Sequence, residues 1–146
     1  MTPPVPIDPI IFYIDRCLGR KLARTLQQHG LTIALHDDHF PQNALDVDWL
    51  PIVGQRGWVV LTKDARISRN TIERLTVATY NIRMFALTSQ NLTGDEMANA
   101  FMAAMTRIQQ QVRQQDAPFI AKVYRDGRVK LYRDRPALLD ELQQST

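Results

Sequence analysis

Four short apolar runs alternate with segments of helical periodicity along residues 10–115, and this alternation limits the possible folds more than any other feature. The runs lie at 9–14, 31–35, 58–62 and 84–87. The helical segments fall at 18–29, between Asp46 and Gly57, at 71–79, and from a capping box at Thr93 and Glu96 to about Gln114. Strands that alternate with helices imply right-handed crossovers, and therefore an α/β fold with a parallel sheet covered on both faces.

The C-terminal part follows a different pattern. Residues 121–125 and 128–132 alternate around Asp126-Gly127, which predicts a β-hairpin with a two-residue loop. Asp134 and Pro136 then indicate the start of a short helix. We therefore expect one domain over residues 1–146, with an α/β core at about 10–115, a hairpin appendage at 119–133, and a closing helix and tail at 134–146.

Composition points to a cytoplasmic location. No apolar run approaches the roughly 20 residues needed to cross a bilayer, and the N-terminus lacks the basic-then-apolar order of a signal peptide. The single cysteine, Cys17, cannot form an internal disulfide, and we expect it to be buried as a small apolar side chain. The net charge of +3 is a mild basic excess that favours approach to a polyanion without requiring one.

Acidic residues stand where the predicted strands end. Asp15 closes the first strand, Asp37 and Asp38 follow the second, Asp46 opens the next helix as its expected N-cap, and Asp64 follows the third strand. The carboxyl ends of parallel strands meet at one edge of a sheet, so these carboxylates should converge. Crowded carboxylates repel one another unless a divalent cation neutralises them, and oxygen ligands favour Mg²⁺ or Mn²⁺. Such an ion can activate water for phosphodiester hydrolysis, although each Asp taken alone is equally explained by turn or capping roles.

Several segments together resemble a known family. They are Phe12 to Gly19, His36 to Phe40, Asp46 to Leu50, and Gly57 to Asp64 with Arg66-Ile67, and the likeness continues through 85–88, 91–93 and 118–120. This pattern resembles the PIN-like domains related to VapC toxins. The resemblance implies a three-layer α/β sandwich with a mainly parallel sheet, Mg²⁺ or Mn²⁺ dependence, cleavage of single-stranded RNA, and often an antitoxin partner encoded beside the toxin.

Carried over by position, the resemblance assigns catalysis and metal binding to Asp15, Asp46 and Asp64. The family commonly adds an acid near the last of these, but here no carboxylate follows Asp64 until Glu73. Asp38 is our additional candidate for the metal, with Asp37 and Asp48 as further substitutes. The missing acid also motivates an alternative, a PIN-like scaffold without catalysis that binds a protein or nucleic acid. A receiver-like phosphoacceptor ranks third, because it would need an acidic pair after the first strand.

Two other metal or phosphatase interpretations are weaker. His36 and His39 flank two aspartates, but a zinc site would need more histidines, and only His29 remains. We favour loop hydrogen bonding or RNA contact for them. Asp46-Val47-Asp48 matches the Asp-x-Asp of haloacid-type phosphatases, but it follows a loop and not a buried strand.

Basic residues beside the acids are candidates for substrate binding. Arg16, Lys63, Arg66 and Arg69 could bind phosphates, or could simply lie on solvated loops. On the hairpin, basic residues alternate with tyrosines; they are Lys122, Arg125, Arg128, Lys130, Arg133 and Arg135, with Tyr124 and Tyr132. They could form a platform for a single strand, but strand alternation alone explains a solvated face, which we prefer. The expected partners are RNA and an antitoxin, with a homodimer left open and no membrane.

Overall fold

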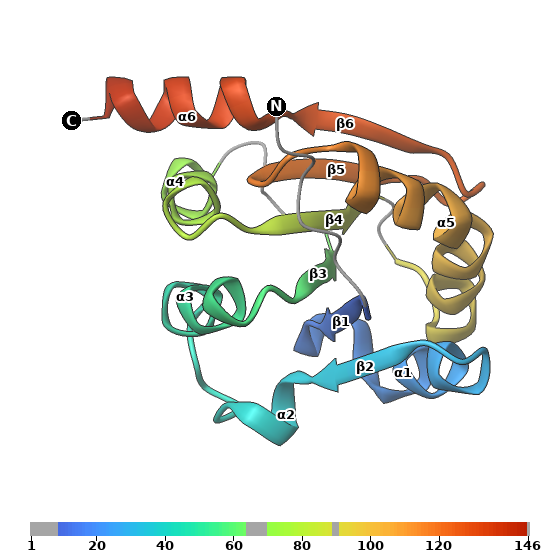
Figure 1. The fold of residues 1–146 in the computed structure, drawn as a ribbon. Coiled ribbons are helices and arrows are strands. Elements are labelled where there is room, and N and C mark those ends of the chain that lie inside the picture. The colour runs from blue at the N-terminus through green and yellow to red at the C-terminus, as the bar shows by residue number, and fades with distance from the viewer. Residues whose placement is uncertain (1–8, 64–69, 89–90, 146) are drawn as a thin grey trace.

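The computed structural model describes residues 9–63, 70–88 and 91–145, with the side chain of Asp46 excepted. The strands are β1 (Ile11–Ile14), β2 (Thr32–Leu35), β3 (Val59–Lys63), β4 (Arg83–Leu87), β5 (Phe119–Val123) and β6 (Val129–Arg133). The helices are η1 (Arg16–Leu18), α1 (Gly19–Gln28), α2 (His36–His39), α3 (Asp46–Arg56), α4 (Thr71–Thr79), α5 (Gly94–Gln114) and α6 (Arg135–Gln144). The predicted alternation of strands and helices is confirmed (Figure 1).

The strands form one six-stranded sheet in the order β2-β1-β3-β4-β5-β6. All neighbouring pairs from β2 to β5 are parallel, and only β6 runs antiparallel to its neighbour β5. The chain moves outward from β1 in one direction to β2 and in the other to β3. In a parallel sheet, such a reversal of strand order opens a crevice at the carboxyl ends of the two strands involved. Here the reversal falls between β1 and β3, so a ligand site is expected at the carboxyl ends of these two strands.

Helices cover both faces of the sheet and make a three-layer sandwich, as the family resemblance implies. On one face, α1 and α5 pack over an apolar cluster that includes Phe12, Leu61 and Phe85. On the other face, the cluster holds Trp49 from α3, Val77 from α4 and Leu138 from α6. Successive residues of the central strands point alternately into the two clusters. Because both faces of these strands are buried, their sequences are almost continuously apolar.

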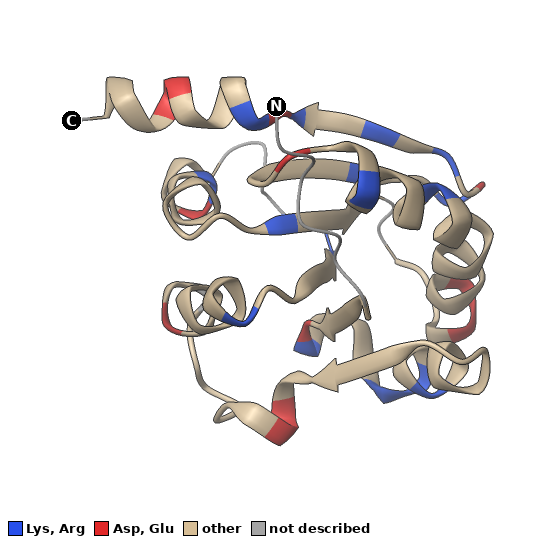
Figure 2. Cartoon of the chain, viewed as in Figure 1, with Lys and Arg blue, Asp and Glu red and all other residues tan. Residues whose placement is uncertain are grey.

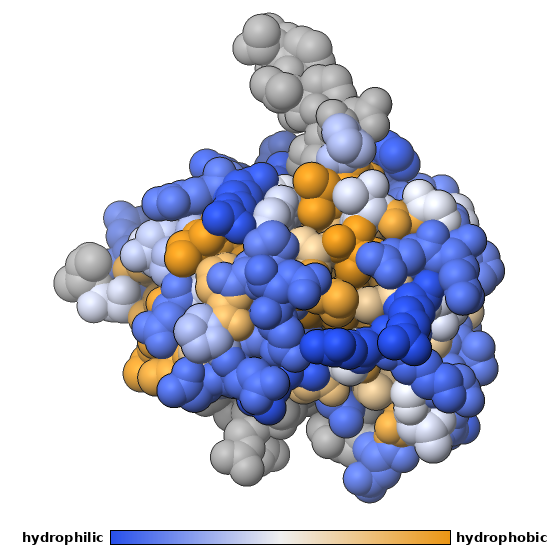
Figure 3. Space-filling view, turned by 90° about the horizontal axis from the view of Figure 1, so that it is seen from below, coloured by the Kyte–Doolittle hydropathy of each residue, from blue (hydrophilic) through white to orange (hydrophobic). Residues whose placement is uncertain are grey.

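The two edges of the sheet differ in character. At the β2 edge, Ile33 and Leu35 are half-buried, and the view from this side shows apolar side chains in the middle of the surface with hydrophilic ones around them (Figure 3). At the other edge, β6 is rich in Lys and Arg. None of the helices in the described ranges has both the length and the apolar character needed to cross a membrane.

Side-chain caps begin several helices where the sequence predicts them. Thr93 and Glu96 form the predicted capping box of α5, with hydrogen bonds of 3.1 and 3.0 Å to each other's backbone N–H. The carboxylate of Asp134 accepts from the Ala137 N–H and starts α6. The N-cap of α3 was predicted one residue too late, because Leu45 takes that position and the Asp48 carboxylate accepts from its N–H at 3.1 Å.

The C-terminal hairpin is part of the central sheet. Strands β5 and β6 pair antiparallel as predicted, but β5 also pairs in parallel with β4, and Phe119 and Ile120 are fully buried. The loop has three residues, 125–127, closed by the hydrogen bond from the Gly127 N–H to the Tyr124 carbonyl, and not the predicted two. Gly127 occupies the left-handed region at φ +90°, which this type of loop requires at its last position.

Candidate active site

Asp15 lies at the carboxyl end of β1, beside β3. It follows β1 directly, and its N–H donates to the carbonyl of Leu61 in β3 at 3.1 Å, so the end of β1 is fixed against β3. Strands β1 and β3 are thus direct neighbours in the sheet. By strand alternation, Asp15 belongs to the same face as Tyr13, which is the face covered by α3 and α4.

The Asp15 carboxylate is held by a threonine that sequence analysis did not identify. Thr62 in β3 is buried, and its hydroxyl donates to Oδ2 of Asp15 at 2.6 Å. The Cys17 thiol also lies against this oxygen, 3.6 Å away, and 3.8 Å from the Thr62 hydroxyl. Both hydrogen bonds that the described residues make to this carboxylate fall on Oδ2, and they fix its orientation.

Cys17 corrects the prediction of a buried apolar side chain. The residue is exposed, because the turn of η1 carries it out of the core, while Leu18 takes the buried position. Its thiol nevertheless turns toward Asp15. Partial desolvation, followed by the negative charge of Asp15, raises the pKa of Cys17 to about 11. The thiol is therefore neutral at physiological pH, which keeps it from adding a second negative charge beside Asp15.

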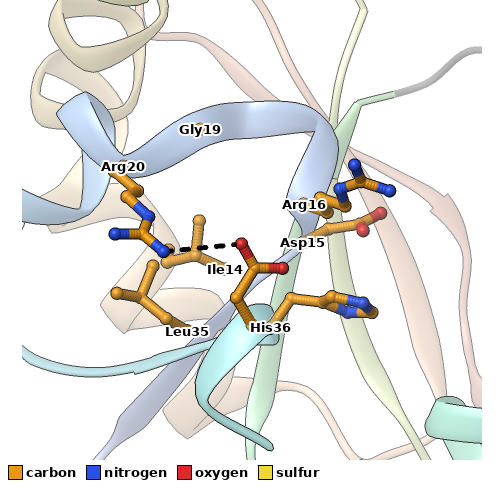
Figure 4. Close-up of a pocket in the computed structure, with 8 residues that line it drawn as sticks. Ile14, Asp15, Arg16, Gly19, Arg20, Leu35 and His36 are labelled. Carbon is orange, nitrogen blue, oxygen red and sulfur yellow. Dashed lines mark ion pairs between the residues drawn. The ribbon is translucent and has the colours of Figure 1, made fainter. Parts of the chain in front are cut away.

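A small pocket lies next to Asp15 at the ends of β1 and β2. Its volume is about 30 Å³, and it is lined by Ile14, Asp15, Arg16, Gly19, Arg20, Leu35, His36 and Asp37. Figure 4 shows Asp15 and Arg16 directed to the same side, with Arg20 on the opposite side. Arg20 pairs with Asp37 at 3.7 Å across the pocket, and Arg16 donates to the carbonyl of Gln42 at 2.7 Å. Arg16 thus ties the loop before α3 to the end of β1.

His36 is a structural residue. It is buried, its Nε2 lies 3.1 Å from the Pro41 carbonyl, and its Nδ1 lies 2.5 Å from the Tyr13 hydroxyl. A carbonyl can only accept, so Nε2 carries the proton and Nδ1 accepts from Tyr13. Both nitrogens are occupied, which agrees with the expected hydrogen bonding and leaves neither for a metal. The segment from His36 to His39 forms the helical turn α2 instead of the expected loop.

The other predicted site residues are described to different extents. Asp46 is the first residue of α3, and its side chain is outside what the structure describes; Lys63 ends β3. Asp64, Arg66 and Arg69 lie outside the described residues. Asp38 is exposed in α2. The other two substitutes have roles in the fold, since Asp48 caps α3 and Asp37 pairs with Arg20.

The donor set within the described residues is incomplete for a divalent cation. No group of three or more His, Cys, Asp or Glu side chains that could hold a metal is found among these residues. Asp15 itself fits a hard cation, since it offers a half-buried carboxylate whose orientation is fixed through one oxygen. The shared metal site of Asp15, Asp46 and Asp64 therefore stays a prediction.

Comparisons with known proteins agree with this fold. The family model described as "PIN like domain" matches residues 10–89, which is more than half of the chain and includes β1 to β4. A Mycobacterium tuberculosis protein named "Putative ribonuclease VapC45" is 27% identical over 117 residues, covering 77% of this chain and 84% of the relative. No solved structure is significantly similar to the chain. The chain belongs to the PIN-like domain family.

Proposed function

We propose that this protein is a Mg²⁺- or Mn²⁺-dependent endoribonuclease that hydrolyses phosphodiester bonds of single-stranded RNA. The observation that carries the proposal is the carboxylate of Asp15, oriented by Thr62 at the carboxyl ends of the neighbouring strands β1 and β3. The relative named as a ribonuclease supports the same chemistry. In line with the resemblance to VapC toxins, the proposal includes a cytoplasmic location and a role as the toxin of a toxin–antitoxin pair.

The topology supports a role for Asp46 and Asp64 beside Asp15. Helix α3 starts after the carboxyl end of β2 and leads back to the amino end of β3, so its first residue, Asp46, belongs to the edge that carries Asp15. Asp64 follows Lys63, which is the last residue of β3. Strand β3 is the direct neighbour of β1 in the sheet. Three carboxylates from these positions would supply the oxygen ligands that Mg²⁺ or Mn²⁺ prefers.

The residues have distinct tasks in this mechanism. A bound cation supplies an activated water and stabilises the negative charge of the phosphoryl group. Asp15, Asp46 and Asp64 would hold the ion, and the Thr62 hydroxyl, which donates to Oδ2 of Asp15, keeps this carboxylate in one orientation. Arg16 and Lys63, with Arg66 and Arg69, bind the phosphates on either side of the scissile bond. Neither a histidine base nor a covalent enzyme intermediate is needed, which agrees with the structural role of His36.

The test compares cleavage of a mixed single-stranded RNA by the wild type and by the Asp15→Asn and Asp64→Asn variants, with and without EDTA. Each substitution keeps the shape of the side chain but removes a full negative charge. Loss of a metal-binding carboxylate removes several kcal/mol of transition-state stabilisation, so we expect the rate to fall by at least about 100-fold. Products should carry 5′-phosphate ends.

A control variant distinguishes the contribution of the aspartates to the cleavage rate from that of the histidines. His39→Ala changes an exposed residue of α2 and should leave the rate within about twofold of the wild type. Cleavage that persists in EDTA, or that is equal in Asp64→Asn and wild type, would contradict the metal-nuclease proposal. The alternative, a PIN-like scaffold that binds a protein or nucleic acid without catalysis, would then be favoured.

A further inference from the structure

The segment from Phe40 to Leu45 connects α2 to α3 and so determines where Asp46, the first residue of α3, lies. Most of this segment is exposed, and only Phe40 and Ala44 are half-buried. It also joins two acidic turns, because α2 and the first turn of α3 both carry aspartates (Figure 2). Their negative charges repel each other until a cation binds. Packing alone therefore does little to fix this segment.

Two hydrogen bonds from outside the segment reach its carbonyls. The Nε2–H of His36 donates to the Pro41 carbonyl at 3.1 Å. The Arg16 guanidinium donates to the next carbonyl, that of Gln42, at 2.7 Å. The Arg16 bond is exposed to solvent, whereas the bond from His36 is partly buried and comes from a buried side chain. Of the two, the His36 bond is the better protected from competition by water.

His36 is itself held by Tyr13 of β1. The Tyr13 hydroxyl donates to Nδ1 of His36 at 2.5 Å, which leaves the proton on Nε2 and directs it at Pro41. Tyr13 is fully buried and precedes Asp15 by two residues in the chain. The Tyr13–His36 pair, as we call these two residues, therefore connects the segment before α3 to the same stretch of backbone that carries Asp15.

The first turn of α3 also packs on this pair. The ring centroid of Trp49, in α3, lies 4.8 Å from that of Tyr13 and 6.2 Å from that of His36. Trp49 is buried and follows Asp46 by three residues, about one turn of the helix. The pair thus contacts both the segment that leads into α3 and the helix itself, on either side of Asp46.

Stability alone does not explain a polar pair at this place. The Tyr13 hydroxyl and the His36 imidazole are both buried, so folding must remove each from water. Replacing both partners of a buried hydrogen bond by apolar groups of similar shape is often nearly neutral for stability. Apolar side chains would fill the space, but they would not direct an N–H at the Pro41 carbonyl. This contrast favours a role in positioning.

We propose that the Tyr13–His36 pair is a positioning device for the metal site: it holds the segment before α3 and thereby places Asp46 relative to Asp15 before a cation binds. The inference rests on the proposed function, because it takes Asp15 and Asp46 to be ligands of one ion. Neither member of the pair has to touch the ion or the RNA. Ligands that are held in place beforehand lose less entropy on binding, so the pair raises the affinity for the cation.

The test measures Mn²⁺ affinity by calorimetry in the variant Tyr13→Phe/His36→Leu, with urea denaturation to confirm that the variant is folded. We expect the affinity to fall about tenfold, as is usual when a residue that supports a metal ligand is lost. His36→Gln retains an N–H donor and an oxygen acceptor, and should keep the affinity within about threefold of the wild type. Tyr13→Phe alone removes one oxygen atom and should give an intermediate loss.

A double-mutant cycle shows whether the pair acts through Asp46. The loss of Mn²⁺ affinity should disappear in an Asp46→Asn background, because the pair then has no carboxylate to place. It should persist in an Asp140→Asn background, which removes the same charge from an exposed position of α6. Ile108→Val deletes one methyl group from the core on the other face of the sheet, and should leave the Mn²⁺ affinity unchanged although it lowers stability.

A second measurement needs neither metal nor RNA. The N–H of Ala44 donates to the Pro41 carbonyl at 3.0 Å, and that of Asp48 donates to the Leu45 carbonyl at 2.8 Å. Without metal, hydrogen exchange at these two amides should be about tenfold faster in Tyr13→Phe/His36→Leu than in the wild type. Amides in the middle of α5 should exchange at the wild-type rate.

The outcomes distinguish this inference from the proposed function. An equal loss of affinity in the Asp46→Asn and Asp140→Asn backgrounds would overturn the positioning role and leave the nuclease proposal intact. Wild-type Mn²⁺ affinity in Tyr13→Phe/His36→Leu would do the same. A wild-type protein that binds no Mn²⁺ would overturn both, since Asp46 would then hold no ion.

Discussion

At the scale of single residues, Thr62 is the contact that sequence analysis missed. Its hydroxyl donates to Asp15 at 2.6 Å, a hydrogen bond to a charged group that is worth about 1.5–3 kcal/mol. Thr62→Val keeps the shape and removes the donor. We expect affinity for Mn²⁺, measured by calorimetry, to fall by about 10- to 100-fold with cleavage falling in parallel, as is usual when the partner of a metal ligand is lost.

Thr62→Ser provides the matched control, because it retains the hydroxyl and should keep Mn²⁺ affinity within a few-fold of the wild type. Unfolding in urea shows whether either variant has lost its fold. Equal Mn²⁺ affinity in Thr62→Val and Thr62→Ser would mean that the hydroxyl does not position Asp15 for a metal.

Cys17 gives a second prediction at this scale. Its pKa is raised from 9.0 to about 11, first by desolvation and then by Asp15. At pH 8 the thiolate fraction is then about 100-fold below that of an ordinary thiol, and alkylation by iodoacetamide should be slower by a similar factor. The pKa of Cys17 is higher in the folded than in the unfolded protein. The contribution of its neutral thiol to the free energy of unfolding is therefore lost as the pH rises from about 9 to about 11.

The measurement is a pH–rate profile of alkylation, with a free cysteine peptide as reference. Asp15→Asn removes the neighbouring charge and should move the inflection to lower pH, though not to that of the peptide, because desolvation remains. An inflection at or below that of the peptide in the wild-type protein would contradict the environment described for Cys17.

At the scale of elements, the capping box of α5 can be tested directly. This helix packs on α1, and Glu96 also pairs with Arg125 of the hairpin turn at 2.6 Å, so its first turn joins two parts of the fold. Thr93→Ala removes the acceptor for the Glu96 N–H and should lower the free energy of unfolding by about 1 kcal/mol. Urea denaturation measures this change. Thr106→Ala, at an exposed position within the same helix, should be neutral or slightly stabilising, and equal losses in both variants would rule out the cap as the cause.

Local patterns predicted most elements, because apolar periodicity and caps act within a few residues. Helix α4 spans Thr71–Thr79 as predicted, and the four parallel strands of the core were all found. What the sequence could not show depends on pairing between distant segments. Strand β5 was assigned to an appendage because the pattern around Asp126-Gly127 pairs it with β6. It nevertheless follows β4 and α5 as in the preceding strand–helix–strand units, and its apolar start, Phe119 to Ala121, was a signal of burial.

The candidate site also contains one residue that local sequence predicted and one that depends on a contact between distant segments. Asp15 was predicted from its position after a buried strand, which is local information. Thr62 lies 47 residues away, and its contact with Asp15 follows only from the adjacency of β1 and β3. The sequence does contain a signal for Thr62: it is a hydroxyl residue near the end of the third predicted strand. The alternation of side chains along that strand places it on the same face of the sheet as Asp15. The register that aligns Thr62 with Ala86 and Lys122 requires the order of three strands, β3, β4 and β5, and no local pattern contains it.

At the scale of the whole molecule, the strand order brings chemistry from distant segments to one edge. Asp15 lies at the carboxyl end of β1, beside β3, and the hairpin of β5 and β6, at one edge of the sheet, carries a net positive charge. A net positive charge on this side of the sheet favours the approach of a polyanion. The C-terminal hairpin completes the sheet and supplies part of its core.

The last prediction follows from that structural role: a chain ending at residue 115 should not fold. Without β5, the edge of β4 is uncovered, and the core loses Phe119, Ile120 and Val123, all with 0% exposure. Burial of three such side chains contributes about 6 kcal/mol, which is comparable to the whole stability of a domain of this size. Circular dichroism and urea denaturation of residues 1–115 should show no cooperative transition, whereas removal of Ser145 and Thr146 alone should leave the transition unchanged. A cooperative transition like that of the full chain would mean that the α/β core folds independently and that the hairpin is a dispensable addition.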